Sequence, residues 1–248
     1  MSRFFLHISY DGTDFEGWQS QLSGNTVQDF LNRALCMVFN LTEIETTGCG
    51  RTDSGVHASS FYLHFDLDQE IVDSNKVIRS LNGILPSSIA CSNLIAMAGD
   101  AHARFDAVLR TYHYHIHKSK NPFKTKFSNW LVYDLNLDLM NEAGNYLLTQ
   151  TDFAAFSKSG SDTRTSICKL YEAEWKESEE NSYVFRISAD RFLRNMVRSI
   201  VGTMVDLGRG KMDLNEFKSI VQSGKRSEAG TSVPASGLFL TNIKYPYL

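Results

Sequence analysis

Residues Glu43 to Leu67 read EIETTGCGRTDSGVHASSFYLHFDL, in which two strand-like segments enclose a run rich in glycine. Glu43 to Thr47 is predicted to be a short strand, and apolar residues at every second position from Phe61 to Leu67 predict a longer one. The glycines between them interrupt both patterns, because glycine favours turns and close backbone approaches over regular strands. We therefore expect two strands joined by a glycine-rich loop.

A helix is predicted on each side of this stretch. Thr26 is an N-cap candidate with an acid three residues later, and apolar residues then recur at helical spacing. A second helix is predicted to begin at Asp73 or Ser74 and to end before Pro86. The outer strands are predicted from Phe4 to Ile8 and from Ile89 to Met97. The first part of the chain therefore has the order βαββαβ.

The second part repeats this order by pattern alone. Its predicted elements are a strand at Val108–His117, a helix at Leu137–Leu148, strands at Ser166–Trp175 and Tyr183–Ser188, helices at Arg191–Leu207 and Asp213–Val221, and a strand at Leu238–Tyr245. The order is βαββαβ with one inserted helix. We predict an α+β protein of two ferredoxin-like halves, residues 1–104 and 105–248, with helices on one face of the sheet.

The composition is that of an ordinary soluble protein, since 42% of the 248 residues are hydrophobic and 21% are charged. No run of eighteen apolar residues occurs, and the N-terminal residues lack the features of a signal peptide. We expect a cytoplasmic protein with no membrane partner. The four cysteines form no CxxC pair, so neither a zinc knuckle nor a disulfide framework is indicated.

Charge is unevenly distributed, although the net charge is only -3. Cations greatly outnumber acids between residues 102 and 126, and residues 186–211 have a similar bias. The cations of the first segment are Arg104, Arg110, Lys118, Lys120, Lys124 and Lys126. Acids gather instead between Glu172 and Glu180. This separation fits a polyanionic partner such as RNA, and the alternative is a solvated mixture of charges.

The glycine-rich loop carries the residues best suited to chemistry. Arg51 and Asp53 lie two positions apart, so in an extended segment both side chains point to the same side. A guanidinium keeps a nearby carboxylate ionised and available as a nucleophile or base. Asp53 is therefore the candidate catalytic residue, and the alternative is a tight turn in which Asp53 caps its own backbone. For Arg51 the alternative is a surface ion pair, which contributes little.

The segment GRTDSGVHA, from Gly50, resembles the signature loop GRTDxGVHA of the tRNA pseudouridine synthase A family. Further blocks resemble that family's blocks in the same order and extend the resemblance over essentially the whole chain. These are ISYDGTDFEGWQSQ from Ile8, FDAVLRTYHYHI from Phe105, TDFAAFSK from Thr151, FLRNMVRSIVGTMVDLGRGK from Phe192 and EAGTSVPASGLFL from Glu228. One departure is TSVP, from Thr231, where the family more often has PTAP.

The resemblance implies an isomerase that converts uridine to pseudouridine at positions 38–40 in the anticodon stem-loop of tRNA. It also implies a homodimer without cofactor, and one continuous mixed, largely antiparallel sheet with the catalytic cleft between the halves. The implied site residues are Asp53 as the essential carboxylate, Arg51 assisting extrusion of the target base, Tyr112 stacking on the uracil, Arg198 lining the pocket and Leu238 closing it with apolar contact.

The first loop matches the family as well, at Asp11, Asp14, Trp18 and Gln19. These residues are interpreted as shaping an RNA groove. A turn formed by Asp11 and Gly12 accounts equally well for the first of them.

In the second part of the chain, the strand and helix patterns predict which face each candidate residue occupies. Tyr112 and Tyr114 share one face of a strand, and Tyr114 is predicted to be core. Three histidines alternate with these tyrosines, but no cysteine or carboxylate cluster accompanies them, so no metal site is predicted. Arg191, Arg194 and Arg198 fall at helical spacing and are predicted to share a cationic helix face.

Two other functions fit part of the sequence. A non-catalytic RNA-binding protein would bind RNA through the aromatics of a ferredoxin-like sheet, but the RNP signature is absent and an acid in the loop repels phosphate. An N-glycoside hydrolase would use the carboxylate and release the base. Such enzymes usually need a second acid or base, and only Asp53 stands out.

Overall fold

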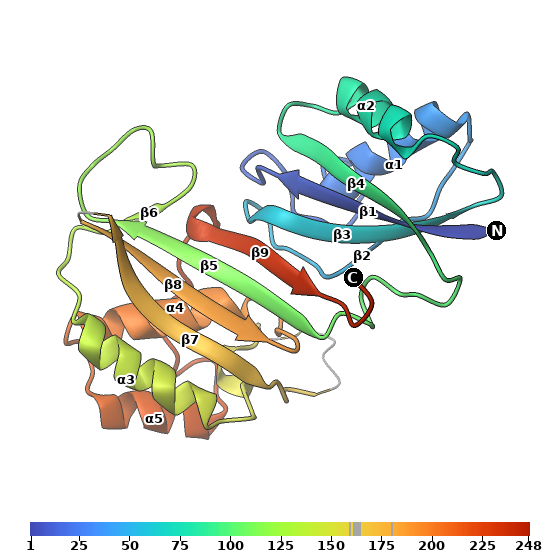
Figure 1. Cartoon of the computed structure of the whole chain (residues 1–248). Helices are drawn as coiled ribbons and strands as arrows, with labels where there is room; N and C mark the ends of the chain where they lie inside the picture. Colours follow the sequence, from blue (N-terminus) through green and yellow to red (C-terminus); the bar gives the residue numbers. More distant parts are fainter. Residues whose placement is uncertain (159, 161–164, 180) are drawn as a thin grey trace. The chain divides into compact units, whose positions relative to one another are not determined.

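The computed structural model describes residues 1–158, 160, 165–179 and 181–248, and Figure 1 shows their helices and strands. Glu180, the last acid of the predicted acidic segment, lies outside the described residues. The chain divides into two compact units, Met1–Val108 with Leu240–Leu248 as unit 1, and Leu109–Phe239 as unit 2.

Unit 1 has the predicted order βαββαβ. Its elements are β1 (Ser2–Tyr10), α1 (Val27–Phe39), β2 (Thr47–Gly48), β3 (His57–Leu67), α2 (Ser74–Ile84) and β4 (Ile89–Met97). Strand β1 lies between β3 and β4 and is antiparallel to both, and β2 pairs with β3. The strand order β4-β1-β3-β2 is that of a ferredoxin-like unit, and α1 and α2 lie on the same side of these strands (Figure 1).

The helices of unit 1 begin where the local sequence predicts. The Thr26 hydroxyl accepts a hydrogen bond from the backbone amide of Asp29 at 3.3 Å. In return, the Asp29 carboxylate accepts a hydrogen bond from the backbone amide of Thr26, also at 3.3 Å. This capping box satisfies donors that the first helical turn leaves without partners. Asp73 caps α2 in the same way, by accepting from the amide of Lys76 at 2.9 Å.

Unit 2 repeats the order with additional short elements. Its elements are β5 (Leu109–His117), β6 (Asn129–Trp130), α3 (Leu137–Leu148), the 3-10 helix η1 (Ala154–Phe156), β7 (Leu170–Glu179), β8 (Ser182–Ala189), α4 (Met196–Gly208), α5 (Leu214–Ser223), the 3-10 helix η2 (Ala235–Gly237) and β9 (Leu238–Lys244). Strand β8 is antiparallel to β5 and β7, whereas β6 is parallel to β5. Strand β9 contributes its first two residues to unit 2 and the rest to unit 1.

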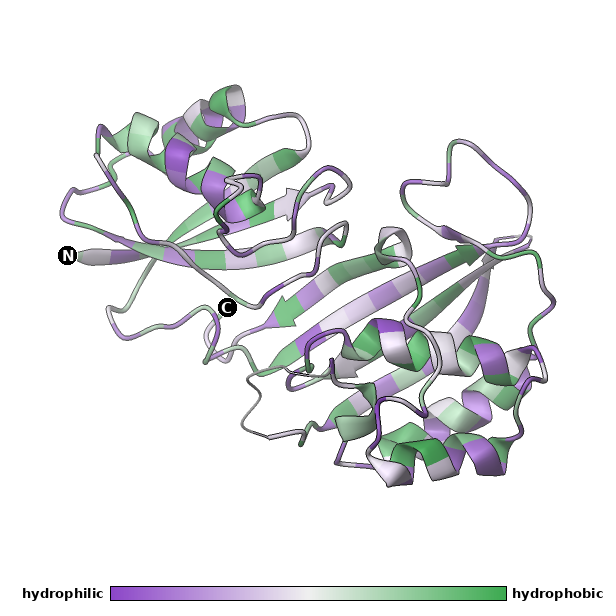
Figure 2. Cartoon of the chain, turned by 180° about the vertical axis from the view of Figure 1, so that it is seen from behind, coloured by the Kyte–Doolittle hydropathy of each residue, from purple (hydrophilic) through white to green (hydrophobic). Residues whose placement is uncertain are grey.

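The described strands form one hydrogen-bonded sheet in the order β4-β1-β3-β9-β5-β8-β7, with β2 and β6 attached to β3 and β5. The α+β class, the ferredoxin-like halves and the mixed, largely antiparallel sheet are therefore confirmed. Hydrophilic and hydrophobic residues are mixed along both the strands and the helices (Figure 2). None of the helices in the described part of the chain has the length and apolar character needed to span a bilayer.

Three predicted boundaries are wrong, and in each case other hydrogen bonds explain the difference. Residues 43–46 do not join β2, since the carbonyl of Thr46 accepts from the Gln28 side chain at 2.7 Å. Strand β7 begins at residue 170 instead of 166, because the amide of Lys169 donates to the Asp190 carboxylate at 2.9 Å. Helix α4 begins at residue 196 instead of 191, because Asn195 has the left-handed φ of 66°.

Candidate active site

The glycine-rich loop of unit 1 rests on the loop that joins β1 to α1. The amide of Trp18 donates to the Thr52 carbonyl at 3.3 Å, and the amide of Gly55 donates to the Phe15 carbonyl at 3.2 Å. Trp18 and Phe15 are themselves buried, with 1% and 5% of their surface exposed. The loop that carries Asp53 is therefore held by backbone bonds to a well-packed neighbour.

Two glycines of the first loop make this close approach possible. A Cβ atom on Gly12 would lie 2.0 Å from the Val56 carbonyl oxygen, and one on Gly17 would lie 2.5 Å from the Thr52 oxygen. Gly17 also has a φ of +91°, which L side chains rarely adopt. No other residue fits at either position without moving the loop around Asp53.

Asp53 is half-buried and starts a turn. Its carbonyl accepts a hydrogen bond from the amide of Val56 at 3.2 Å, and Gly55 provides a positive φ of 78°. A turn closed by backbone atoms is thus present at Asp53. A turn and a catalytic role are compatible, because the turn fixes the backbone from which the carboxylate projects.

Buried polar contacts secure both ends of this loop. The hydroxyls of Tyr10 and Thr52 lie 2.9 Å apart in the core, and the amide of Gly12 donates to Nδ1 of His57 at 3.0 Å. Asp11 accepts from the amide of Thr13 at 2.9 Å and lies 3.1 Å from the same His57 nitrogen. Asp11 thus helps to build the loop, in agreement with the turn interpretation.

Arg51 is exposed and is held by an amide. Its Nε donates to Oε1 of Gln19 at 3.3 Å. Within the described part of the chain, Arg51 forms no ion pair, so the surface ion pair considered from the sequence is not found. Its guanidinium lines a groove of about 940 Å³ together with Trp18, Gln19 and Gly50.

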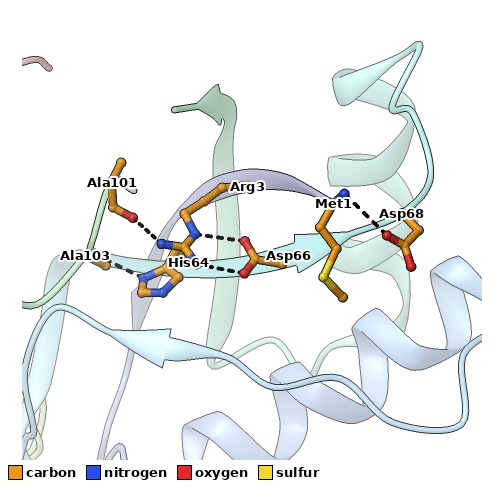
Figure 3. A network of polar contacts seen from close by, with 7 residues as sticks. All are labelled: Met1, Arg3, His64, Asp66, Asp68, Ala101 and Ala103. Atoms are coloured by element: carbon orange, nitrogen blue, oxygen red, sulfur yellow. Dashed lines mark hydrogen bonds and ion pairs between the residues drawn. The ribbon is translucent and has the colours of Figure 1, made fainter. Parts of the chain in front are cut away.

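The same groove of unit 1 is also lined by Arg3 of β1 and by His64 and Asp66 of β3. Arg3 donates to both carboxylate oxygens of Asp66, at 2.8 and 2.7 Å, and to the Ala101 carbonyl at 2.9 Å (Figure 3). The hydrogen bonds from Arg3 lower the pKa of Asp66. Burial, reinforced by Arg3, lowers the pKa of His64 to about 4, so this ring is neutral at pH 7 and accepts from the Ala103 amide at 3.1 Å.

In unit 2, Tyr112 and Tyr114 have the different environments that the sequence predicts. Tyr114 is fully buried, and its hydroxyl donates to the Pro234 carbonyl at 3.0 Å, which confirms it as core. Burial raises the pKa of its phenol. Tyr112 is only half-buried, and Phe192 packs edge-on against its ring at a centroid distance of 5.1 Å.

Arg198 lies in the first turn of α4 and is tied to the segment before β9. Its Nε donates to the Val233 carbonyl at 2.8 Å, and its own carbonyl accepts from the Val233 amide at 3.2 Å. This segment touches α4 where Gly202 lies, since a Cβ there would be 1.9 Å from the Thr231 oxygen. It then leads into Leu238, which is 5% exposed.

The structure therefore places the predicted site residues in two sets. Arg51 and Asp53 share one loop of unit 1. Tyr112, Arg198 and Leu238 lie on β5, α4 and β9 of unit 2, where α4 and the residues before β9 are joined through Val233.

The predicted cationic helix face of α4 is wrong, because Arg191 and Arg194 precede the helix. Some lysines of the basic segment are also neutralised. Lys118 forms an ion pair with Asp134, and Lys124 donates to Glu179 at 2.8 Å. Only part of the predicted positive charge is therefore available to a polyanion.

Comparison with known proteins assigns this chain to a family. A family model described as tRNA pseudouridine synthase matches residues 143–246. The tRNA pseudouridine synthase A of Bacteroides fragilis is 45% identical over 246 residues, which cover 99% of this chain and 97% of that protein. Those of Bacteroides thetaiotaomicron and Porphyromonas gingivalis are 44% and 40% identical, each over 99% of this chain, and over 91% and 98% of their own lengths.

The chain belongs to the tRNA pseudouridine synthase A family. The resemblance seen in its glycine-rich loop is thereby confirmed.

The contacts that hold the side chains of the site could not be predicted from the sequence. Gln28, which bonds to Gln19, is nine residues away from it, and Phe192 is far in sequence from Tyr112. The carbonyl of Val233 leaves no sequence signal at all. The match of Gln19 to the family's first loop indicated a role for this residue but not its bond to Arg51.

Proposed function

We propose that this chain converts uridine to pseudouridine at positions 38–40 in the anticodon stem-loop of tRNA, with Asp53 as the essential carboxylate. Membership of the tRNA pseudouridine synthase A family makes it an isomerase of this class, and the 45% identity over nearly the whole chain is the observation that carries the proposal. The half-buried Asp53 in its braced glycine-rich loop supports the choice of catalytic residue.

The reaction needs the groups that these residues supply. The bond between N1 and C1' breaks, the uracil turns, and a bond between C5 and C1' forms, while C5 loses a proton and N1 gains one. Reactant and product are isomers, so the overall change requires neither oxidant nor reductant, and we propose that no cofactor takes part. Asp53 acts as nucleophile or base toward the nucleoside.

The remaining residues are proposed to hold the target nucleotide. Extrusion of a base from a stacked stem-loop costs a few kcal/mol. Arg51 would assist extrusion, and the half-buried ring of Tyr112 would offset part of the cost by stacking on the uracil. Arg198 would line the pocket and Leu238 would supply apolar contact.

This proposal requires residues of the N-terminal half, 1–104, and of the C-terminal half, 105–248, to act on one uridine in a cleft between the halves. We also propose a cytoplasmic homodimer. Unit 2 exposes large apolar side chains in one segment, including Phe123, Trp130 and Val132, at 90%, 46% and 58%. Exposed apolar surface of this kind often marks a protein contact, and sedimentation equilibrium of the purified chain tests the dimer.

Product analysis tests the activity and separates it from the two alternatives. A tRNA transcript is incubated with wild-type protein or with Asp53→Asn, and the nucleosides and free bases are quantified. Isomerisation predicts pseudouridine without free uracil from the wild type, and neither product from Asp53→Asn, which still binds tRNA. Free uracil would mean hydrolysis, and binding without any product would mean a non-catalytic RNA-binding protein.

A further inference from the structure

We infer that Gln19 is a positioning residue, which holds the guanidinium of Arg51 in a defined orientation through a relay of side-chain amides. The inference rests on the proposed function, because it gives Gln19 a part in presenting Arg51 to the target nucleotide. Arg51 Nε donates to Gln19 Oε1 at 3.3 Å, and Gln19 Nε2 donates to Gln28 Oε1 at 2.9 Å.

The direction of this relay is set at its buried end. Gln28 Nε2 lies 2.7 Å from the Thr46 carbonyl oxygen, which can only accept. The Oε1 atom of Gln28 must therefore face the other way, where it accepts from Gln19 Nε2 and from the amide of Ser20, each at 2.9 Å. With its nitrogen committed to Gln28, the amide of Gln19 must turn its oxygen toward Arg51.

The buried end of the relay is also rigid. Gln28 is only 7% exposed and is the second residue of α1, and its own amide donates to the Trp18 carbonyl at 3.1 Å. Thr46, at the end of the relay, donates through its hydroxyl to Asn32 at 2.7 Å. The exposed Gln19 is therefore anchored in the core through a side chain that has little freedom.

Arg51 is the residue of the relay that most needs such support. A long exposed side chain has many rotamers, and ordering it during binding costs affinity. Among the described residues, the bond from Nε to Gln19 is the one hydrogen bond of the Arg51 side chain, so the relay leaves both terminal nitrogens available to a nucleic acid. An arginine held by Nε alone is ordered without losing the donors that recognise a base or phosphate.

A neutral acceptor suits this task better than a carboxylate. The amide oxygen of Gln19 orients the guanidinium and leaves its full positive charge for the RNA. A glutamate at the same position would form an ion pair with Arg51 and weaken its attraction for phosphate. We therefore expect Gln19→Glu to lower the affinity for tRNA, even though it retains an oxygen acceptor.

A double-mutant cycle tests the coupling of Gln19 to Arg51. Pseudouridine formation is measured for the wild type, Gln19→Ala, Arg51→Ala and the double variant, with Gln21→Ala as the matched control. Gln21 lies in the same loop and donates to the Glu16 carbonyl at 2.8 Å, away from Arg51. Gln19→Ala is expected to lower kcat/KM about fivefold, as the loss of one hydrogen bond predicts, and to have no further effect once Arg51 is alanine.

A second measurement does not depend on activity. In protein labelled with ¹⁵N-arginine, the Nε–H signal of Arg51 is identified by its loss in Arg51→Ala, and it should shift in Gln19→Ala but not in Gln21→Ala. Equal effects of Gln19→Ala in both backgrounds of the cycle, or an unmoved Arg51 signal, would overturn the inference. A wild-type protein that yields no pseudouridine would instead refute the proposed function, and the Arg51 signal would then still report whether Gln19 holds the guanidinium.

Discussion

Replacing Gly12 by alanine should displace the catalytic loop, and the structure indicates by how much. The new Cβ would lie 2.0 Å from the Val56 oxygen and 2.6 Å from the Val56 carbonyl carbon, whereas Cβ contacts under 3.0 Å essentially never occur. Both clashing atoms belong to the backbone, so no side-chain rotation relieves the contact. The chain around Val56 must move by about 1 Å.

The displacement reaches Asp53 through the turn. The amide of Val56 donates to the Asp53 carbonyl, so a shift of one residue moves the other. Overpacking of this kind costs about 3 kcal/mol of unfolding free energy, at the upper end of the usual range, because backbone has to yield. A misplacement of about 1 Å at a catalytic group lowers the rate about 100-fold.

Two assays measure these effects. Urea denaturation gives the change in stability, and single-turnover pseudouridine formation at saturating tRNA gives the rate. Gly99→Ala is the matched control in unit 1, since a Cβ there meets no atom within 4 Å. A Gly12→Ala protein with the stability and rate of the control would refute the argument that this loop is braced by close backbone contact.

Three further predictions concern other parts of the chain. Because the pKa of His64 falls from 6.5 to about 4 on folding, the unfolded chain binds the proton of this residue first as pH decreases. Between pH 7 and 5, the unfolding free energy measured by urea denaturation should therefore fall by about 2 kcal/mol less in His64→Gln than in the wild type. Gly202→Ala, whose Cβ would lie 1.9 Å from the Thr231 oxygen, should reduce single-turnover rates by about tenfold or more through Arg198, and unchanged rates would contradict this. Arg194→Ala should reduce the slope of log binding constant against log salt concentration, measured for tRNA, by about one. Lys124→Ala should reduce this slope by less, because Lys124 is paired with Glu179 in the free protein. Equal reductions in the two variants would show that the ion pair opens when tRNA binds.

Local signals made much of the fold predictable. The Thr26 capping box and the Asp73 cap each depend on residues only three positions apart, and both helices begin directly after these caps in the structure. Alternation of apolar residues likewise located β3, whose ladder with β1 requires that period. The fold class follows from the order of such elements.

The errors occurred where distant partners override local pattern. Residues around Lys169 resemble a strand, but they bond to Asp190 and to the segment near residue 151 instead of continuing β7. At the start of α4, the arginines have helical spacing, yet Asn195 adopts a left-handed conformation that no periodicity reveals. The supports of the site were hidden for the same reason, because the path of a loop decides whether Gln19 meets Gln28.

The Asp53 carboxylate is proposed to be essential to the chemical step. Tritium release from tRNA labelled at C5 of its uridines tests it most directly, since C5 loses its hydrogen only when the new bond to the sugar has formed. With tRNA in excess over its measured dissociation constant, the wild type should release tritium and Asp53→Asn should release none above background. Release by Asp53→Asn at a rate near that of the wild type would contradict it.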